Sequence, residues 1–175
     1  KVDMHNGHII GGEALVRWQN DKEMIYPDQF IPVLEKNGYV IDVDNFIWNK
    51  VCACIKMMED KGIEPVPISV NVSRMHVYQE KFTENLKNMA GEYGIDPKYI
   101  PLEITESAFT KEEGSLFKKV QSLQGYGFKF SMDDFGSGYS SLGMLKSERV
   151  DEVKIDKTFV DDIATDKGKV LLGNV

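Results

Sequence analysis

The sequence predicts an α/β fold with a parallel sheet, of the TIM-like (β/α)8 barrel type, with about the first five strands of that barrel in this chain. Short apolar runs recur about 25–55 residues apart, as βα units require, and helical patterns lie between them. Strands that alternate with helices are typical of a parallel sheet. Four of the runs also end in, or contain, a carboxylate or amide, and in parallel barrels such groups meet at the carboxyl ends of the strands.

The expected strands are short runs of apolar or alternating residues. They lie near residues 8–17, 66–72, 100–105, 128–132 and 152–155. Five strands do not close an eight-stranded barrel, so we expect further βα units to follow in the native protein. No linker or low-complexity stretch divides the chain. Residues 1–175 are therefore expected to form a single domain that lacks its C-terminal βα units.

The expected helices fill the intervals between these strands. They cover residues 28–37, 41–61, 80–93 and 111–124, with a short helix before the last strand and the start of another at 167–175. The longest carries apolar residues close to helical spacing, at Ile41, Val43, Phe46, Ile47, Val51, Ile55 and Met58. Glycines follow three of the helices, at Gly62, Gly94 and Gly125, as is typical of helix C-termini.

Composition narrows the class of protein. Of the 175 residues, 42% are hydrophobic and 28% are charged, which is typical of a soluble globular domain with one sizeable core. The net charge of −7 argues against a DNA or RNA polymer held on a broad basic surface, but not against a small phosphorylated ligand at a metal. Cys52 and Cys54 are expected to be unpaired thiols in a reducing compartment.

The expected location is the cytoplasm. There is no apolar run of about 18 residues that would span a membrane, and the first residues lack the layout of a signal peptide. The chain begins with Lys1 rather than Met, so we expect it to be part of a longer protein. That parent is expected to carry regulatory or sensor domains and could be anchored in a membrane.

Five oxygen-bearing side chains occur where apolar runs end or are interrupted. They are Glu13, Asn71, Glu103, Asp133 and Asp134, in the segments GGEALVRW, VPISVNVS, YIPLEITES and FKFSMDDFG. A fifth run, VDEVKID, brings Lys154. Hard divalent cations prefer oxygen ligands. Oxygen donors together with a cationic side chain indicate metal-assisted phosphate chemistry.

These segments resemble those of EAL domains, which are cyclic di-GMP phosphodiesterases. GGEALVRW is similar to the segment that gives the family its name, and five further segments resemble family segments in the same order: PDQFIPVLEKNG, ISVNVS, LEITES, MDDFGSGYSSL and VKIDKTFV. The resemblance covers essentially all 175 residues. It implies hydrolysis of cyclic di-GMP to linear pGpG in bacterial second-messenger signalling, on a barrel fold.

The resemblance also implies a metal site. Glu13, Asn71, Glu103 and Asp133 would bind a first Mg²⁺ or Mn²⁺, and Asp134 would face a second. Adjacent residues of a strand point to opposite faces, but both aspartates can reach the site if the chain turns at the strand end. The alternative is that each of these residues is a helix cap or a surface carboxylate.

Two more residues would act in catalysis. By resemblance, Lys154 stands near the metal-bound water and orients or polarises it; the alternative is a structural pair with Asp156, which shares its face of the strand. Glu106 would hold the loop that carries Asp133 and Asp134; the alternative is a carboxylate that stabilises a helix N-terminus. Glycines at 136 and 138 would give this loop its backbone freedom.

Three residues would contact the substrate. Arg17, at the end of the first expected strand, would bind a phosphate, for which a guanidinium is well shaped. Leu15 would lie under a guanine, and Asp156 is the third residue expected to contact the substrate. The alternatives are a surface salt bridge for Arg17 and an ordinary core position for Leu15.

The main alternative function is a non-catalytic receptor that binds cyclic di-GMP and signals through partners. A third reading is a metal-dependent phosphohydrolase barrel with another substrate. Family members carry a later Glu in an E-G-V-E segment and a Gln near a Q-G-Y/F segment, and neither occurs in this chain. The 175-residue piece alone can therefore lack activity. A homodimer is also expected, because family members often dimerise near the later strands.

Overall fold

The structure is a computed structural model, and it describes residues 1–21, 23–106, 108, 113–136 and 150–157. Its centre is a parallel sheet of five strands in the order β1-β4-β5-β6-β7, so these strands follow one another across the sheet in chain order. The strands are β1 (Gly12–Ala14), β4 (Ile68–Asn71), β5 (Leu102–Thr105), β6 (Phe130–Phe135) and β7 (Glu152–Ile155). A wall of sequential parallel strands with helices between them confirms the predicted α/β class and forms half of a barrel.

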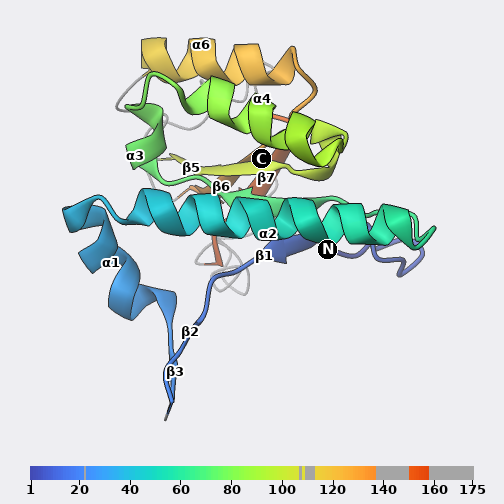
Figure 1. Cartoon of the computed structure of the whole chain (residues 1–175), viewed down its shortest axis with the longest axis horizontal. Coiled ribbons are helices and arrows are strands. Elements are labelled where there is room, and N and C mark those ends of the chain that lie inside the picture. The colour runs from blue at the N-terminus through green and yellow to red at the C-terminus, as the bar shows by residue number, and fades with distance from the viewer. Residues whose placement is uncertain (22, 107, 109–112, 137–149, 158–175) are drawn as a thin grey trace, which may run out of the picture.

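The helices pack together along one side of this wall. They are α1 (Pro27–Asn37), α2 (Val40–Asp60), α3 (Arg74–Val77), α4 (Phe82–Tyr93) and α6 (Glu113–Gln124), with a 3-10 turn η1 (Pro97–Tyr99). Figure 1 shows α2, α4 and α6 one above another, and contacts join α2 to α4 and α4 to α6. The hydrophobic core lies between these helices and the sheet.

Alternation along β5 separates the core from the opposite face of the sheet. Leu102 and Ile104 are fully buried in the hydrophobic core. Glu103 lies between them in sequence, so its side chain points to the opposite face of the sheet, which is the inside of the half-barrel. The strand therefore serves both the core and the candidate site.

The buried stripe of helix α2 is displaced from the predicted one, with which it shares Val51 and Ile55. Trp48, Val51, Cys52 and Ile55 are buried at helical spacing, whereas Phe46, an expected member of the apolar stripe, is 58% exposed. The helix ends beside Gly62, which has a positive φ of 68° that glycine adopts without strain.

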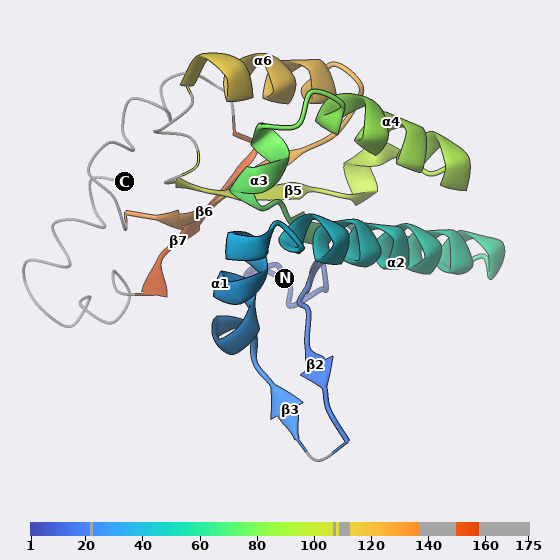
Figure 2. The ribbon, with the colours of Figure 1, turned by 60° about the vertical axis from the view of Figure 1, so that its left-hand side comes forward.

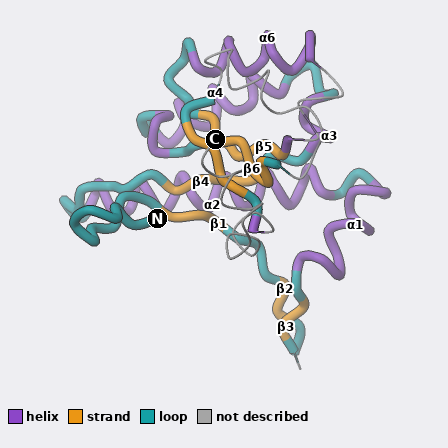
Figure 3. The backbone as a smooth tube through the Cα atoms, turned by 180° about the vertical axis from the view of Figure 1, so that it is seen from behind, coloured by secondary structure: helices purple, strands orange, loops and turns teal. Residues whose placement is uncertain are grey.

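The first strand is shorter than expected. Only Gly12–Ala14 joins the sheet, and the chain then leaves it in an antiparallel hairpin of β2 (Trp18–Gln19) and β3 (Met24–Ile25) that projects from the rest of the molecule (Figures 2 and 3). The hairpin, α3 and η1 were not predicted. The short helix expected before β7 and the one expected at 167–175 lie outside the described residues.

Among the helices of the described ranges, none is both long enough and apolar enough to cross a membrane.

Candidate active site

The oxygen-bearing residues lie on neighbouring strands, on or next to the inner face of the sheet. Glu13 lies in β1, Asn71 ends β4, Glu103 lies in β5, both aspartates lie in β6, and Lys154 lies in β7. The strand register sets Asn71 opposite Glu103 and Thr105 opposite Asp133. Because all five strands are parallel, these residues converge toward the same carboxyl edge of the sheet.

Lys154 lies at the centre of this group. Its Nζ lies 2.8 Å from Glu103 Oε2, 3.0 Å from Glu13 Oε2 and 3.2 Å from Asp133 Oδ1. Burial alone would lower the pKa of Lys154, but the hydrogen bonds to the two glutamates and the charge of Asp133 outweigh it and raise the pKa above its usual value. The ammonium therefore stays charged at physiological pH, held by carboxylates from three strands.

Glu103 is the most deeply buried of the carboxylates, with a side chain that is not exposed at all. Burial, the largest single influence, would raise its pKa, but the hydrogen bond from Lys154, the contact with Ser69 and the charges of Lys154 and Lys1 together outweigh it. The pKa of Glu103 therefore lies below its usual value. Its Oε1 accepts no hydrogen bond within the described part of the chain, although Lys1 Nζ lies 3.6 Å away. A buried, ionised carboxylate oxygen without a donor is a suitable ligand for a hard cation.

The two adjacent aspartates lie at an irregularity in β6. The register with β7 shifts between Met132 and Phe135, and Asp134 has a φ of 54°, in the left-handed region. We expected a turn at the strand end to bring both carboxylates to the site; the structure instead places a bulge within β6. Partial burial raises the pKa of Asp134, and the neighbouring charges of Asp133 and Asp156 raise it further.

Glu106 fixes the end of β6. It is buried, and its Oε2 accepts a hydrogen bond of 2.9 Å from the backbone N–H of Gly136. Gly136 has a φ of 97° and follows β6 directly. The contact is the one expected if Glu106 holds the segment that carries Asp133 and Asp134. Positions 137–149 lie outside the described residues.

The three expected substrate contacts lie around the edge of this group. Arg17 lies three residues beyond the end of β1 and is exposed; its guanidinium donates to the Val16 carbonyl at 2.7 Å and lies 5.9 Å from the Tyr26 ring centroid. Leu15 is 53% exposed, so the alternative of a core leucine is wrong. Asp156 follows β7, and its N–H donates to the Phe135 carbonyl at 3.2 Å.

The carboxylates surround the Lys154 ammonium rather than a shared empty point. Consistent with this, no three His, Cys, Asp or Glu side chains among the described residues are already arranged to hold a metal ion. The chemistry of the group nevertheless fits a hard cation, because every candidate donor is an oxygen and Glu103 offers one without a hydrogen bond.

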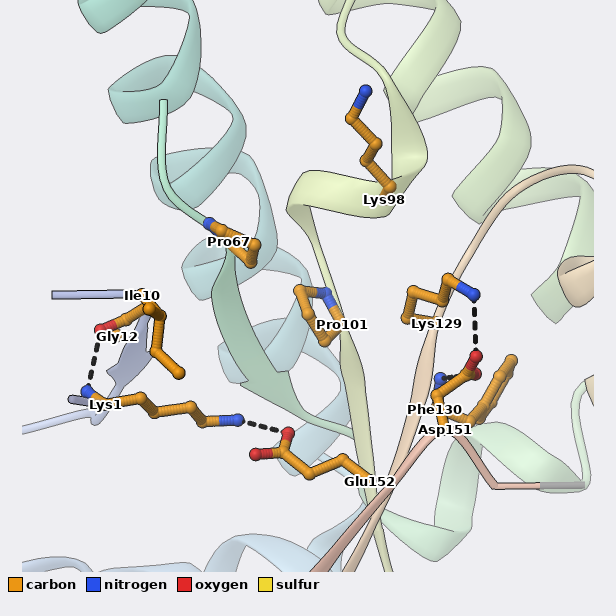
Figure 4. A pocket seen from close by; sticks show the side chains of 11 residues that line it. Lys1, Ile10, Gly12, Pro67, Lys98, Pro101, Lys129, Phe130, Asp151 and Glu152 are labelled. Carbon is orange, nitrogen blue, oxygen red and sulfur yellow. Dashed lines mark hydrogen bonds and ion pairs between the residues drawn. The ribbon is translucent and has the colours of Figure 1, made fainter. Parts of the chain in front are cut away.

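A separate cavity of about 380 Å³ lies at the other end of the strands (Figure 4). Gly12, Pro67, Pro101, Phe130 and Glu152 line it, at or just before the starts of β1, β4, β5, β6 and β7. In parallel barrels this end contributes to stability, whereas the chemistry lies at the carboxyl ends. We therefore place the candidate site at the carboxyl ends.

Sequence reasoning missed a cluster behind the site. Asp44, Trp48 and His76 are buried, and Asp44 and Trp48 bond to the backbone around Asn71. The sequence did hold one signal for this cluster: Asp44 is a carboxylate four residues before Trp48, on the apolar face of α2.

The unpaired state of both cysteines was predicted correctly, and burial raises the pKa of the Cys52 thiol to about 12.

Comparisons with known proteins agree with this geometry. A family model described as the EAL domain matches residues 1–172. The bifunctional diguanylate cyclase/cyclic di-GMP phosphodiesterase MucR of Pseudomonas aeruginosa is 32% identical over 167 residues, which are 95% of this chain and 24% of that protein. The oxygen sensor protein DosP of Escherichia coli is 33% identical over 168 residues, 95% of this chain and 21% of that protein. The chain thus spans less than a quarter of these two relatives.

Solved structures show the same fold. The PaMucR phosphodiesterase in its c-di-GMP complex superposes with a TM-score of 0.89 at 31% identity, over 98% of this chain and 70% of that one. The EAL enzyme Bd1971, in a form with cAMP and cyclic di-GMP bound, also gives a TM-score of 0.89 at 26% identity, over 99% of this chain and 48% of that one. From the family match along almost its whole length, the chain belongs to the EAL domain family.

Proposed function

We propose that this chain is part of a cyclic di-GMP phosphodiesterase that opens its substrate to linear pGpG, with Mg²⁺ or Mn²⁺, in bacterial signalling. One observation carries the proposal: Glu13, Glu103 and Asp133, from three different strands, all lie within 3.2 Å of the Lys154 ammonium. One carboxylate would neutralise Lys154. Three carboxylates leave an excess of negative charge at the strand ends, which suits the binding of divalent cations.

The metal ligands of this proposal are Glu13, Asn71, Glu103 and Asp133 for a first cation, and Asp134 for a second. All five offer oxygen, which favours Mg²⁺ or Mn²⁺ over zinc. Asn71 already lies beside Glu13, with its Nδ2 3.4 Å from Glu13 Oε1. When bound, such cations lower the pKa of a water and neutralise charge on the phosphate.

Lys154 and Glu106 support the reaction in different ways. The ammonium of Lys154, charged and fixed by two hydrogen bonds, orients the attacking water and stabilises negative charge next to the carboxylates. Glu106 does not touch the reacting atoms; through Gly136 it keeps Asp133 and Asp134 in place. Glu106 is thus a positioning residue.

Substrate contacts complete the proposal. The exposed guanidinium of Arg17 binds a phosphate of the dinucleotide, and the exposed side chain of Leu15 packs under a guanine. Asp156, at the end of β7, accepts a hydrogen bond from the substrate. The PaMucR structure, a phosphodiesterase in complex with c-di-GMP, supports this choice of ligand.

We also propose that residues 1–175 form the first part of one EAL domain whose remaining βα units complete the barrel. The share of 70% of the solved PaMucR chain supports this. The curated relatives are several times longer, which supports regulatory domains in the whole protein. A cytoplasmic location and a homodimer belong to the same proposal.

Hydrolysis of cyclic di-GMP by the full-length protein tests this function. We expect pGpG to form with Mg²⁺ or Mn²⁺ and not with a chelator. Glu13→Gln should abolish turnover and change the free energy of unfolding by less than about 1 kcal/mol, since a partly exposed ligand contributes little to folding. Glu64→Gln is the matched control, because Glu64 is exposed and precedes β4, whereas the candidate site lies at the carboxyl ends of the strands.

Two outcomes would contradict the proposal. Binding of cyclic di-GMP without turnover would assign the protein to the receptor class. Neither binding nor turnover, with hydrolysis of a simpler phosphodiester, would show a phosphohydrolase with another substrate.

A further inference from the structure

Two side chains of α2 bond to the backbone where β4 ends. Trp48 Nε1 donates a hydrogen bond of 3.0 Å to the carbonyl oxygen of Asn71. Asp44 Oδ2 accepts one of 3.0 Å from the N–H of Ser73. The donor Trp48 and the acceptor Asp44 lie on successive turns of one helix, so α2 is hydrogen-bonded to the chain on both sides of Val72.

Both of these α2 side chains are buried. Trp48 is 2% exposed and Asp44 is 9% exposed. Polar contacts in such surroundings are stronger than at the surface, and losing one partner leaves a buried group unsatisfied. Both bonds therefore constrain the backbone more than an exposed hydrogen bond would.

His76 and Phe82 hold the indole in place. The rings of Trp48 and His76 lie 4.4 Å apart, and those of Trp48 and Phe82 lie 6.2 Å apart. His76 Nε2 also lies 3.3 Å from Asp44 Oδ2. Asp44, Trp48, His76 and Phe82 thus form a cluster of mutual contacts, from which the indole N–H donates to Asn71.

The segment it holds carries a residue of the site. Three successive backbone groups are fixed: the carbonyl of Asn71 by Trp48, the N–H of Val72 by the Glu103 carbonyl at 2.9 Å, and the N–H of Ser73 by Asp44. The Asn71 side chain points to the other side, with Nδ2 3.4 Å from Glu13 Oε1. Fixing the backbone on this side sets where that amide lies.

We propose that Trp48 and Asp44 are positioning residues for Asn71, and that they set the affinity of the site for its first cation. The inference rests on the proposed function, in which Asn71 is a ligand of that cation. Neither residue touches the site directly; both act through the backbone of residues 71–73. Partners of this kind, one step behind a metal ligand, commonly govern metal affinity.

Trp48→Phe in the full-length protein tests the proposal. Phenylalanine keeps an aromatic ring against His76 but has no N–H to donate. We expect Mn²⁺, measured by calorimetry without nucleotide, to bind about tenfold more weakly. The KM for cyclic di-GMP at saturating Mn²⁺ should stay unchanged, because the proposed substrate contacts lie elsewhere.

A second pair of variants guards against misfolding. Asp44→Asn keeps an oxygen that accepts from Ser73, so it should retain most of the Mn²⁺ affinity, whereas Asp44→Ala should lose it. Phe82→Leu is the packing control, because it contacts the same rings without bonding to residues 71–73. It should lower Tm and leave the Mn²⁺ affinity intact.

The outcomes separate this inference from the proposed function. Wild-type protein that neither binds Mn²⁺ nor hydrolyses cyclic di-GMP would overturn both. Wild-type protein that binds Mn²⁺, with Trp48→Phe equal to it, would overturn the positioning role alone. An equal loss of affinity in Phe82→Leu would also overturn it, because general loosening of the core would then be the cause.

Discussion

Asp134 has a backbone conformation that residues with a side chain seldom adopt, with a φ of 54°. Such a conformation costs roughly 1–2 kcal/mol unless the residue is glycine. Strain of this kind persists where the surrounding structure imposes it, and it is often found at functional sites. Here the strained residue lies between Asp133 and the glycine that Glu106 holds.

Replacing Asp134 should separate strain from charge. In chelator, Asp134→Gly should raise the free energy of unfolding by about 1 kcal/mol relative to Asp134→Ala, because only glycine accepts the positive φ without cost. Urea denaturation measures this difference. Both variants should lose turnover, since both lack the proposed ligand for the second cation; equal stabilities would show that φ at this position is not strained in solution.

Arg17 offers a test of substrate binding that leaves the fold untouched. Its side chain is exposed and its polar contact is with the carbonyl of the preceding residue. Arg17→Ala should therefore raise the KM for cyclic di-GMP, leave kcat nearly unchanged, and change the free energy of unfolding by less than about 0.5 kcal/mol. Steady-state kinetics and denaturation provide both numbers, with the exposed Arg74→Ala as control. A fall in kcat at constant KM would move Arg17 from binding to catalysis.

For single residues, the sequence predicts the members of the candidate site better than it predicts which strands supply their contact partners. The polar residues stand out because each interrupts an apolar strand, and Lys154 demands a partner because an unpaired ammonium is costly to bury. The sequence does not reveal that this partner comes from β1 and β5 as well as β6, since strand register decides it. The bulge at Asp134 also depends on neighbouring strands. The roles of these residues remain predictions.

Among the elements, the side chain of Asp151 adds to the backbone pairing that joins the start of β7 to β6. Asp151 accepts hydrogen bonds from the Phe130 N–H at 2.9 Å and from Lys129 Nζ at 2.7 Å, and its own N–H donates to the Phe130 carbonyl. Burial would raise the pKa of Asp151, but these bonds and the charge of Lys129 together outweigh it and hold the pKa below its usual value. This set of contacts, called the Asp151 clamp below, therefore depends on an ionised carboxylate.

Its contribution should depend on pH in a defined direction. Because the folded state holds the ionised form, the stabilisation is complete above the pKa of an unfolded aspartate and is lost as the pH falls through the lower folded-state pKa. At pH 7, Asp151→Asn should cost about 1 kcal/mol, and the cost should shrink below about pH 4. Urea denaturation across pH measures this. Asp60→Asn, in an exposed pair with Lys56, should cost almost nothing; a pH-independent cost for Asp151→Asn would contradict the clamp.

Elements with a strong period could be predicted, and short ones could not. Helices α1, α2 and α4 agree with expectation to within two residues at each end, and α6 ends at Gln124 as expected, because their buried faces recur at helical spacing. The strand expected at 8–17 is wrong beyond Gly12–Ala14, since Ile9 and Ile10 are 70% and 53% exposed although they read as a strand. The hairpin of β2 and β3 has two residues in each strand, too few to show a period.

In the whole molecule, the sheet divides two kinds of environment. Helices α2, α4 and α6 supply an apolar layer on one face, while Glu13, Glu103 and Lys154 lie on the other. The stability of the fold and the chemistry of the site therefore depend on opposite faces of the same strands. This explains why the alternation of strands and helices could be predicted from periodicity, whereas the barrel type and the function required the polar residues that interrupt the apolar runs.

The strand order has a consequence for how the chain behaves in solution. Within the described residues, β1 is hydrogen-bonded only to β4 and β7 only to β6, so two strands present unpaired backbone donors and acceptors. Exposed edges of this kind are templates for another sheet. Residues 1–175 expressed alone should therefore self-associate as their concentration rises, which light scattering after size exclusion would detect. A monomer at all concentrations would show that these edges are covered.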